Sequence, residues 1–272
     1  MKNLIVSLKS KIKNKLCYEK TKDRNINVLD DDIFLVSYPK SGNTWFRFLI
    51  GNLISTEQVT FLNMEKLVPA IYGNTNKYLS KIPSPRILKS HEYFDPRYRT
   101  VLYLVRDPRA IAVSYFHHAK KFNIIDKSMN FETYLNLFLT GKLDPYGSWK
   151  ENVGSWLGAL SGDQDRFYLI KYEDLIKNTF KELKQIAIFL KVDSDDKRIN
   201  NAIESSAFEK MRKMEQDQKN EVKVFKNTNL EMPFIRKGKV NDWNAYFNRE
   251  TLNKINSAFK DIMLQLGYEI DN

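Results

Sequence analysis

Short continuous apolar runs alternate along the chain with longer amphipathic stretches. The short runs occur at Ile33 to Ser37, Arg86 to Lys89, Val101 to Val105 and Arg166 to Ile170. Runs of this kind are typical of strands that a parallel sheet buries on both faces. Strands that alternate with helical stretches indicate an α/β fold. The pattern therefore predicts a single α/β domain with a central, mostly parallel β-sheet flanked by helices.

Helical spacing of apolar residues covers most of the remaining chain. From Thr44, the sequence TWFRFLIGNLIS has this spacing, and Asp107-Pro108 opens another helix because proline is favoured in a first turn. Further helices are expected at Phe131 to Leu139, Asn152 to Ala159, Asp174 to Leu190, Arg198 to Met211 and Arg249 to Leu266. The polar stretch Lys213 to Asn229 lacks apolar periodicity. We interpret it as a surface loop that connects elements, with a lid as the alternative.

The first 32 residues form a basic lead, and we expect the domain to span residues 33–272. The lead begins MKNLIVSLKSKIKNKL, which places Leu4, Leu8, Ile12 and Leu16 on one helical stripe among lysines. We interpret this stripe as a helix docked on the body of the protein or a frayed end, with peripheral contact to an anionic membrane as the alternative. No apolar run approaches the roughly 18 residues of a membrane span, and no secretory signal is recognisable.

Composition narrows the classes of protein that fit. Of the 272 residues, 42% are hydrophobic, which supports a sizeable core and excludes disordered and low-complexity classes. The 44 Lys and Arg residues against 33 Asp and Glu residues give a formal charge of +11, which favours an anionic partner. The single cysteine, Cys17, excludes an intramolecular disulfide and a cysteine-based zinc site. Cytoplasmic localisation is therefore expected.

Tyr38 to Trp45 joins the first predicted strand to the first predicted helix. A glycine turn at such a junction directs free backbone N–H groups and the positive end of the helix dipole at one point, which makes an anion-binding cradle. Lys40 adds a positive charge, and Ser41, Asn43 and Thr44 add short donors. The order of residues differs from the G-x-x-x-x-G-K-[ST] loop of kinases, and the chain also lacks the dinucleotide motif G-x-G-x-x-G.

The string SYPKSGNTW resembles the 5′-phosphosulfate loop of sulfotransferases that use 3′-phosphoadenosine 5′-phosphosulfate (PAPS). Val101 to Ser114 is similar to the family's strand, loop and helix that bind the cofactor's 3′-phosphate. Phe234 to Trp243 is similar to its Arg-Lys-Gly-x-x-Gly-Asp-Trp segment, with Asn241 in place of the second glycine. The resemblance extends from about Ile33 to Tyr268. It implies a three-layer arrangement like that of the P-loop kinases.

The resemblance also implies a cofactor site. Its residues are Lys40, Ser41, Gly42, Asn43, Thr44, Trp45, Arg106, Ser114, Tyr172, Phe208, Arg236, Lys237 and Gly238. Arg106 and Ser114 would bind the 3′-phosphate, and Arg236 and Lys237 would close on the same side. Trp45 and Phe208 would sandwich the adenine with Tyr172 at its edge, an arrangement that suits aromatic stacking on a purine.

Transfer of a sulfuryl group to a hydroxyl or amine needs a base for the acceptor proton and positive charge on the leaving phosphate. Lys89-Ser90-His91 stands where the family has its Lys-x-His segment, so the resemblance implies that His91 is the general base. Lys40 would neutralise the bridging oxygen, and Lys89 would assist. No metal is expected. His117 and His118 have no such support, and we interpret them as helix residues that flank the site.

The acceptor is the open part of this prediction. Aromatic residues near the predicted site in chain order, which suit an apolar or aromatic alcohol, are Tyr72, Tyr78, Tyr93, Phe94, Phe116 and Tyr146. We expect a small-molecule acceptor, with a carbohydrate or glycolipid as the alternative. A nucleotide kinase and a non-catalytic nucleotide-binding protein are less favoured, and the scattered lysines argue against nucleic-acid binding. The dimer motif of vertebrate cytosolic members has no match at Asn244 to Asn253, so the oligomeric state stays open.

Overall fold

A parallel β-sheet forms the centre of the protein in its computed structural model, which describes residues 26–143, 145–163, 165–222, 225, 228–236, 238 and 242–270. Within these residues the strands are β1 (Ile33–Ser37), β2 (Ile87–Ser90), β3 (Thr100–Val105) and β4 (Phe167–Lys171). They lie in the order β2-β1-β3-β4, and every neighbouring pair is parallel. The prediction of a mostly parallel sheet is confirmed.

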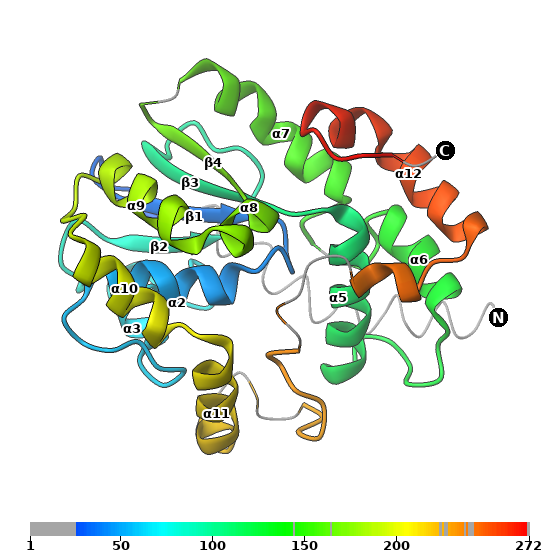
Figure 1. Cartoon of the computed structure of the whole chain (residues 1–272), viewed down its shortest axis with the longest axis horizontal. Helices are drawn as coiled ribbons and strands as arrows, with labels where there is room; N and C mark the ends of the chain where they lie inside the picture. The colour runs from blue at the N-terminus through cyan, green and yellow to red at the C-terminus, as the bar shows by residue number, and fades with distance from the viewer. Residues whose placement is uncertain are drawn as a thin grey trace.

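Helices cover both faces of this sheet (Figure 1). One face packs against α5 (Pro108–Lys121), α6 (Phe131–Leu139), α7 (Trp149–Gly162) and α12 (Arg249–Gln265). The other face packs against α2 (Asn43–Ile54), α8 (Tyr172–Lys177), α9 (Thr179–Phe189) and α10 (Asp196–Ser205). Alternation along β1 explains the layers, because Phe34 and Val36 enter the first core whereas Leu35 enters the second. The result is a single three-layer α/β domain.

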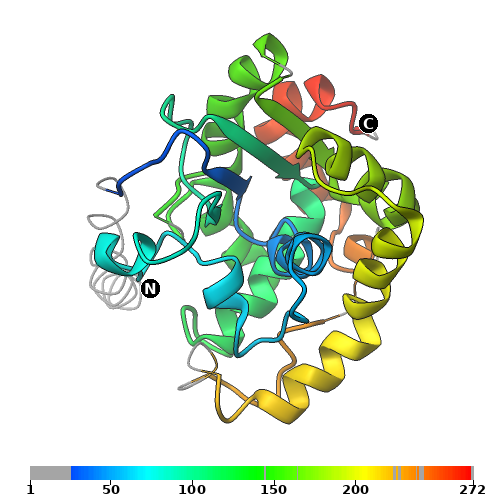
Figure 2. The same ribbon diagram turned by 90° about the vertical axis from the view of Figure 1, so that its left-hand side faces the viewer.

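Further elements complete the fold. They are α3 (Met64–Leu67), α4 (Asn76–Leu79), α11 (Phe208–Gln218) and the 3₁₀ helix η3 (Asp242–Ala245). In the turned view the chain descends along one side of the molecule from α9 through α10 to α11 (Figure 2). Among the residues that the structure describes, no helix is long and apolar enough to cross a membrane. The leucine stripe expected in the first 16 residues lies outside the described residues.

Two predicted helices are each divided in the structure. The predicted helix Asp174 to Leu190 breaks at Asn178, whose non-helical backbone (φ −145°, ψ 67°) ends α8 and whose side chain accepts the Lys181 N–H to cap α9. Arg198 to Met211 breaks at Ser206 and Ala207, between α10 and α11. There the buried Ser206 accepts hydrogen bonds from Trp45 through its carbonyl and from Asn52 through its hydroxyl. Capping and tertiary contacts therefore override continuous helical periodicity.

The predicted loop at Lys213 to Asn229 is wrong in its first part, because α11 continues to Gln218. The inward face of this helix includes Glu215, which is buried although it is a carboxylate. Its oxygens accept the backbone N–H groups of Phe234 (2.6 Å) and Ile235 (2.8 Å). A polar residue that is buried by such bonds does not contribute to an apolar pattern, so hydrophobic periodicity could not predict this part of the helix.

Candidate active site

The carboxyl ends of β1, β2 and β3 meet at one edge of the sheet. Because β1 lies between β2 and β3, the chain passes from β1 to β2 on one side of β1 and then crosses to β3 on its other side. In open α/β sheets such a reversal of strand order creates a crevice at the carboxyl ends of the strands, where ligands bind. Three segments predicted to carry chemistry begin here: the loop after Ser37, His91 after β2, and Arg106 after β3.

The loop between β1 and α2 is shaped by residues with positive φ. Lys40 has φ 70° and Gly42 has φ 100°. A Cβ atom on Gly42 would lie 2.5 Å from the ring of Tyr172, so this position accepts no side chain without displacing that ring. Gly42 also caps α2 without a side-chain hydrogen bond, and the first N–H groups of a helix lack intrahelical partners. The loop therefore presents backbone donors toward the crevice.

The side chains of the loop differ in their surroundings and hydrogen-bond partners. Asn43 faces β1, where its amide donates to the Ser37 hydroxyl at 3.0 Å, so its backbone N–H is the donor left for an anion. Ser41 is buried, and no described residue bonds its hydroxyl. Thr44 is partly exposed at the start of α2. Buried polar groups in proteins generally have a hydrogen-bond partner, and a polar ligand would supply one for the Ser41 hydroxyl.

Arg106 lies beside this loop. The register that pairs Val105 with Lys171 brings Arg106 next to Tyr172, and its Cζ lies 4.3 Å from the ring centroid. Its Nη1 donates to the Lys40 carbonyl at 3.4 Å, and its buried Nε has no partner among the described residues. A buried guanidinium in these surroundings suits a bound anion.

The neighbouring acid is paired elsewhere. Asp107 forms a buried ion pair with Arg109 at 2.7 Å and caps α5 by accepting the Arg109 N–H. Its own N–H donates to Glu173 (3.0 Å), which also accepts the Tyr268 hydroxyl (3.1 Å). Burial raises the pKa of Glu173. Asp107 therefore supports the start of α5 and does not neutralise Arg106.

Aromatic residues predicted to hold adenine lie around the same loop. Trp45 packs edge-on against Tyr172, with ring centroids 5.9 Å apart, and donates to the Ser206 carbonyl at 3.1 Å. Phe208 begins α11 two residues later, and the Cβ of an alanine at Gly238 would lie 2.9 Å from its ring. The structure therefore brings together Trp45, Tyr172 and the Phe208–Gly238 pair. We call this group, with the loop residues Lys40 to Thr44 and Arg106, the loop side.

Lys40 joins the loop side to α5. Its Nζ lies 3.3 Å from His118 Nδ1 and 5.0 Å from the centroid of Phe234. Burial and the positive charges of Arg106 and Arg236 lower the pKa of Lys40 to about 7. Ser114, one helical turn before His118, is partly exposed on α5. Lys237 lies outside the described residues.

His91 is oriented by the backbone of β1. Its Nδ1 lies 2.6 Å from the Ser37 carbonyl oxygen, and a carbonyl only accepts hydrogen bonds, so Nδ1 carries the proton. In the neutral ring Nε2 is then the unprotonated nitrogen. Burial and nearby Lys89 lower the pKa of His91 well below its usual value, with the bond to Ser37 opposing them. The imidazole is therefore neutral at neutral pH.

Aromatic rings surround His91. Tyr72 stacks on the imidazole at 5.8 Å and 19°, and Tyr146 approaches its edge at 5.6 Å. Lys89 Nζ lies 4.4 Å from the centroid of Tyr72. We call these four residues the histidine side. The other predicted aromatic residues lie differently: Phe94 packs on Trp156, and Phe116 packs on Phe131 and Tyr134.

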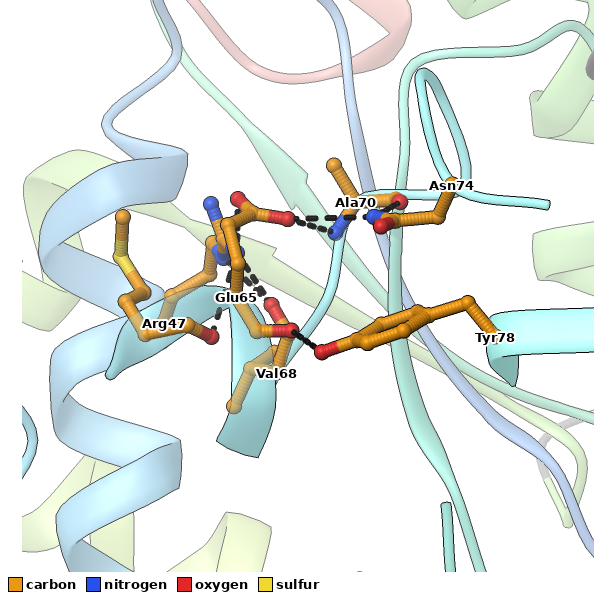
Figure 3. A network of polar contacts seen from close by, with 7 residues as sticks. Arg47, Glu65, Val68, Ala70, Asn74 and Tyr78 are labelled. Carbon is orange, nitrogen blue, oxygen red and sulfur yellow. Dashed lines mark hydrogen bonds and ion pairs between the residues drawn. The ribbon is translucent and has the colours of Figure 1, made fainter. Parts of the chain in front are cut away.

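A polar network holds the segment that carries Tyr72 (Figure 3). The buried Arg47 of α2 donates to the Val68 carbonyl and forms an ion pair with Glu65 at 2.7 Å. Glu65 in turn accepts the Ala70 N–H at 2.9 Å. Tyr78, expected near the acceptor, instead donates to the Glu65 carbonyl (3.1 Å) at the outer end of this network. The network fixes the backbone immediately before Tyr72.

Residues 228–236, which we call the strap, cross from α5 to α11 (Figure 1). Lys121 of α5 donates to the carbonyls of Asn229 (3.0 Å) and Met232 (2.6 Å), and Glu215 of α11 holds the other end. Sequence patterns alone gave no functional role to His118, Phe234, Arg47 or Glu215. For His118 a signal existed, because it lies four residues after Ser114 on the same helical face.

Within the described residues, no group of three or more His, Cys, Asp or Glu side chains is arranged to hold a metal ion. The loop side contributes cations, backbone donors and aromatic rings, whereas the histidine side contributes a neutral imidazole among tyrosines. This set of groups fits a nucleotide anion next to a hydroxyl-bearing molecule.

Comparisons with known proteins agree with this arrangement. A family model described as "Sulfotransferase domain" matches residues 30–267. Sulfotransferase 1B1 of Mus musculus is 30% identical over 251 residues, which cover 85% of this chain and 82% of the relative. The 3-beta-hydroxysteroid sulfotransferase of Cavia porcellus is 27% identical over 252 residues, which cover 87% and 85%.

Solved structures give the same result. The crystal structure of mouse sulfotransferase SULT7A1 complexed with PAP is similar with a TM-score of 0.73 and 27% identity, covering 90% of this chain and 88% of that one. Retinol dehydratase in a complex with retinol and PAP shares the fold, with a TM-score of 0.75 and 22% identity over 94% and 88% of the two chains. The chain therefore belongs to the sulfotransferase domain family and is an enzyme of the sulfotransferase class.

Proposed function

We propose that this enzyme transfers the sulfuryl group of PAPS to a hydroxyl of a small-molecule acceptor, with His91 as the general base. The observation that carries the proposal is the pairing of two sites at one sheet edge: buried donors on the loop side, and a neutral imidazole with an unprotonated Nε2 on the histidine side. The structural neighbour from mouse was solved with PAP, the desulfated form of the donor, which supports a PAPS site here.

The loop side accounts for donor binding. Backbone N–H groups from Gly42 to Trp45 would hold the 5′-phosphosulfate, and Arg106 with Ser114 would hold the 3′-phosphate. Trp45, Phe208 and Tyr172 would contact the adenine. Arg236 and Lys237 would add positive charge on the 3′-phosphate side. The buried Arg106 Nε and Ser41 hydroxyl, which have no partner among the described residues, fit this polyanionic ligand.

The histidine side accounts for the chemistry. In the transfer, the acceptor oxygen forms a bond to sulfur while the bond between sulfur and the phosphate oxygen breaks. His91 Nε2 takes the acceptor proton, because Nδ1 is already committed to the Ser37 carbonyl. Lys40 balances negative charge on the leaving phosphate, and Lys89 assists from β2. PAPS supplies the activated sulfuryl group.

The acceptor class follows from the surroundings of His91. Tyr72 and Tyr146 present aromatic surface within 6 Å of the imidazole centroid, which favours a flat or apolar acceptor that bears a hydroxyl. One relative is named for 3-beta-hydroxysteroids and another for amines, and a structural neighbour was solved with retinol; these names support a small-molecule acceptor. A steroid or phenol is therefore the acceptor to try first.

The test begins with calorimetric titration of the protein with PAP in the presence of a chelator, with ATP as the control ligand. Strong preference for PAP is expected, because the loop side has a separate place for a 3′-phosphate. Labelled PAPS is then supplied with phenols, steroids and amines, and transfer of label is followed. Equal binding of ATP and PAP would contradict the donor assignment, and transfer to sugars alone would contradict the acceptor class.

A further inference from the structure

His118 contacts the loop side from α5. Its Nδ1 lies 3.3 Å from Lys40 Nζ, and an ammonium only donates hydrogen bonds, so Nδ1 is the acceptor and carries no proton. The proton of the neutral ring is then on Nε2. This tautomer is opposite to that of His91, whose Nδ1 donates to a carbonyl. The two histidines therefore have different roles.

Three aromatic rings fix the His118 imidazole. Phe122 lies 4.2 Å away at 35°, and Tyr115 approaches edge-on at 5.8 Å, both from the same stretch of chain as His118. The third ring, Phe234, belongs to the strap, and its centroid lies 6.4 Å from that of the imidazole. Because the ring is packed from both elements, its Nδ1 occupies a defined position relative to Lys40.

Lys40 is otherwise in unfavourable surroundings. Arg106 and Arg236 repel its charge and burial removes water, and among the described residues His118 alone offers Nζ a hydrogen-bond acceptor. The charged groups that face His118 are Lys40, Lys121 and Lys89, with His91 as a further titratable neighbour. Burial and these cations lower the pKa of His118, so it stays a neutral acceptor at neutral pH.

We propose that His118 is a positioning residue for the reaction proposed above: its Nδ1 holds the Lys40 ammonium at the phosphosulfate loop, ready for the 5′-phosphate side of the donor. This inference rests on the proposed function. It predicts that loss of the acceptor at position 118 makes the charged form of Lys40 harder to maintain, and that donor binding then declines at a lower pH.

The experiment measures PAP affinity by calorimetry between pH 6.5 and 8.5. The variants are His118→Phe, which keeps an aromatic ring without an acceptor, and His118→Asn, whose amide oxygen lies near the place of Nδ1. For His118→Phe we expect about a tenfold loss at pH 8.5 and a smaller loss at pH 6.5, as for a pKa lowered by about one unit. His118→Asn is expected within about threefold of the wild type throughout, since it restores an acceptor.

The matched control is His117→Phe. His117 is the adjacent histidine on α5, and its Nε2 lies 2.8 Å from the Tyr246 hydroxyl, away from Lys40. Its profile is expected to follow the wild type. If His118→Phe shows a wild-type profile, or if both His118 variants lose affinity equally at every pH, the positioning role is wrong. If the wild type itself fails to bind PAP, the proposed function is wrong instead.

A second measurement needs no variant. Nitrogen NMR of the wild-type protein distinguishes the two tautomers of a histidine. We expect His118 protonated on Nε2 and His91 protonated on Nδ1. A His118 ring protonated on Nδ1 would overturn the inference even if His118→Phe does not fold.

Discussion

The loop side and the histidine side of the site are built by different means. The loop side depends on backbone: a glycine at φ 100°, the start of α2, and an arginine placed by the parallel register of β3 and β4. The histidine side depends on side chains from separate segments, with His91 after β2, Tyr72 on a segment braced by Arg47, and Tyr146 after α6. Backbone geometry suits a ligand of constant shape, whereas packed side chains can be exchanged to suit another acceptor.

The strongest test of this difference is His91→Ala. Loss of the proposed base is expected to lower kcat by about 10²- to 10⁴-fold. PAP affinity should stay within about twofold of the wild type, because His91 belongs to the other side of the site. Turnover and calorimetry are measured on the same preparation. A parallel loss of PAP affinity would mean that the two sides do not divide the work as proposed.

Gly42→Ala tests the backbone side. The new Cβ would meet the Tyr172 ring at 2.5 Å, and alanine is disfavoured at φ 100°. We expect a loss of PAP affinity of about 100-fold, equivalent to about 3 kcal/mol. Gly73→Ala is the matched control, since Gly73 also has positive φ (74°) but an added Cβ there would meet no described atom within 4 Å. Comparable losses in both variants would show that strain anywhere, and not the loop, controls binding.

Glu65→Gln tests how the histidine side is braced. A glutamine has one acceptor oxygen where the glutamate has two, so either Arg47 or the Ala70 N–H loses its acceptor at residue 65 (Figure 3). We expect the acceptor KM to rise about threefold to tenfold as Tyr72 shifts, with PAP affinity unchanged. Glu57→Gln, on an exposed carboxylate that bonds Asn63 and Lys66, is the control. If Glu65→Gln changed only PAP affinity, the Arg47–Glu65 network would support the loop side and not the histidine side.

The smallest expected effect separates the two sides by pH. Because the pKa of His91 lies below its usual value of 6.5, kcat/KM for the acceptor is expected to fall only on the acid side of that value, as the base becomes protonated. Because the pKa of Lys40 is about 7, PAP affinity is expected to fall severalfold as pH rises through and above that value. If the acid loss and the alkaline loss both appeared in acceptor kcat/KM, or both in PAP affinity, pH would not separate the two sides of the site.

The sequence predicted the loop side better than the histidine side for a physical reason. Strand boundaries agree to within one residue at β1 and β3, because fully buried strands leave continuous apolar runs. The residues of the loop side are local to those strand ends, so a short motif identifies them. Trp149 and Trp156 of α7, seven residues apart and so on one helical face, are both fully buried.

The contacts of the histidine side are distant in sequence. The sheet and the end of α6 bring Tyr72 and Tyr146 to His91. Of the other predicted aromatic residues, Phe94 packs on Trp156 but stays 38% exposed, and Phe116 is buried against Phe131. Glu215 and Arg47 are buried through hydrogen bonds, which hydrophobic periodicity does not register. Lys40 and His118 are 78 residues apart, and only the fold brings them to 3.3 Å.

The strap is attached in a way that leaves the exposed part of its own sequence free to vary. Lys121 donates to the Asn229 and Met232 carbonyls, and Glu215 accepts the Phe234 and Ile235 N–H groups. Both anchoring residues therefore bond the backbone of the strap and not its side chains. Substitutions at its exposed positions, such as Leu230 and Glu231, can therefore accumulate without detaching it, whereas Phe234 is held by its contacts with His118 and Lys40. A library restricted to those exposed positions would therefore change the outer surface of this segment while its backbone stays anchored over the loop side.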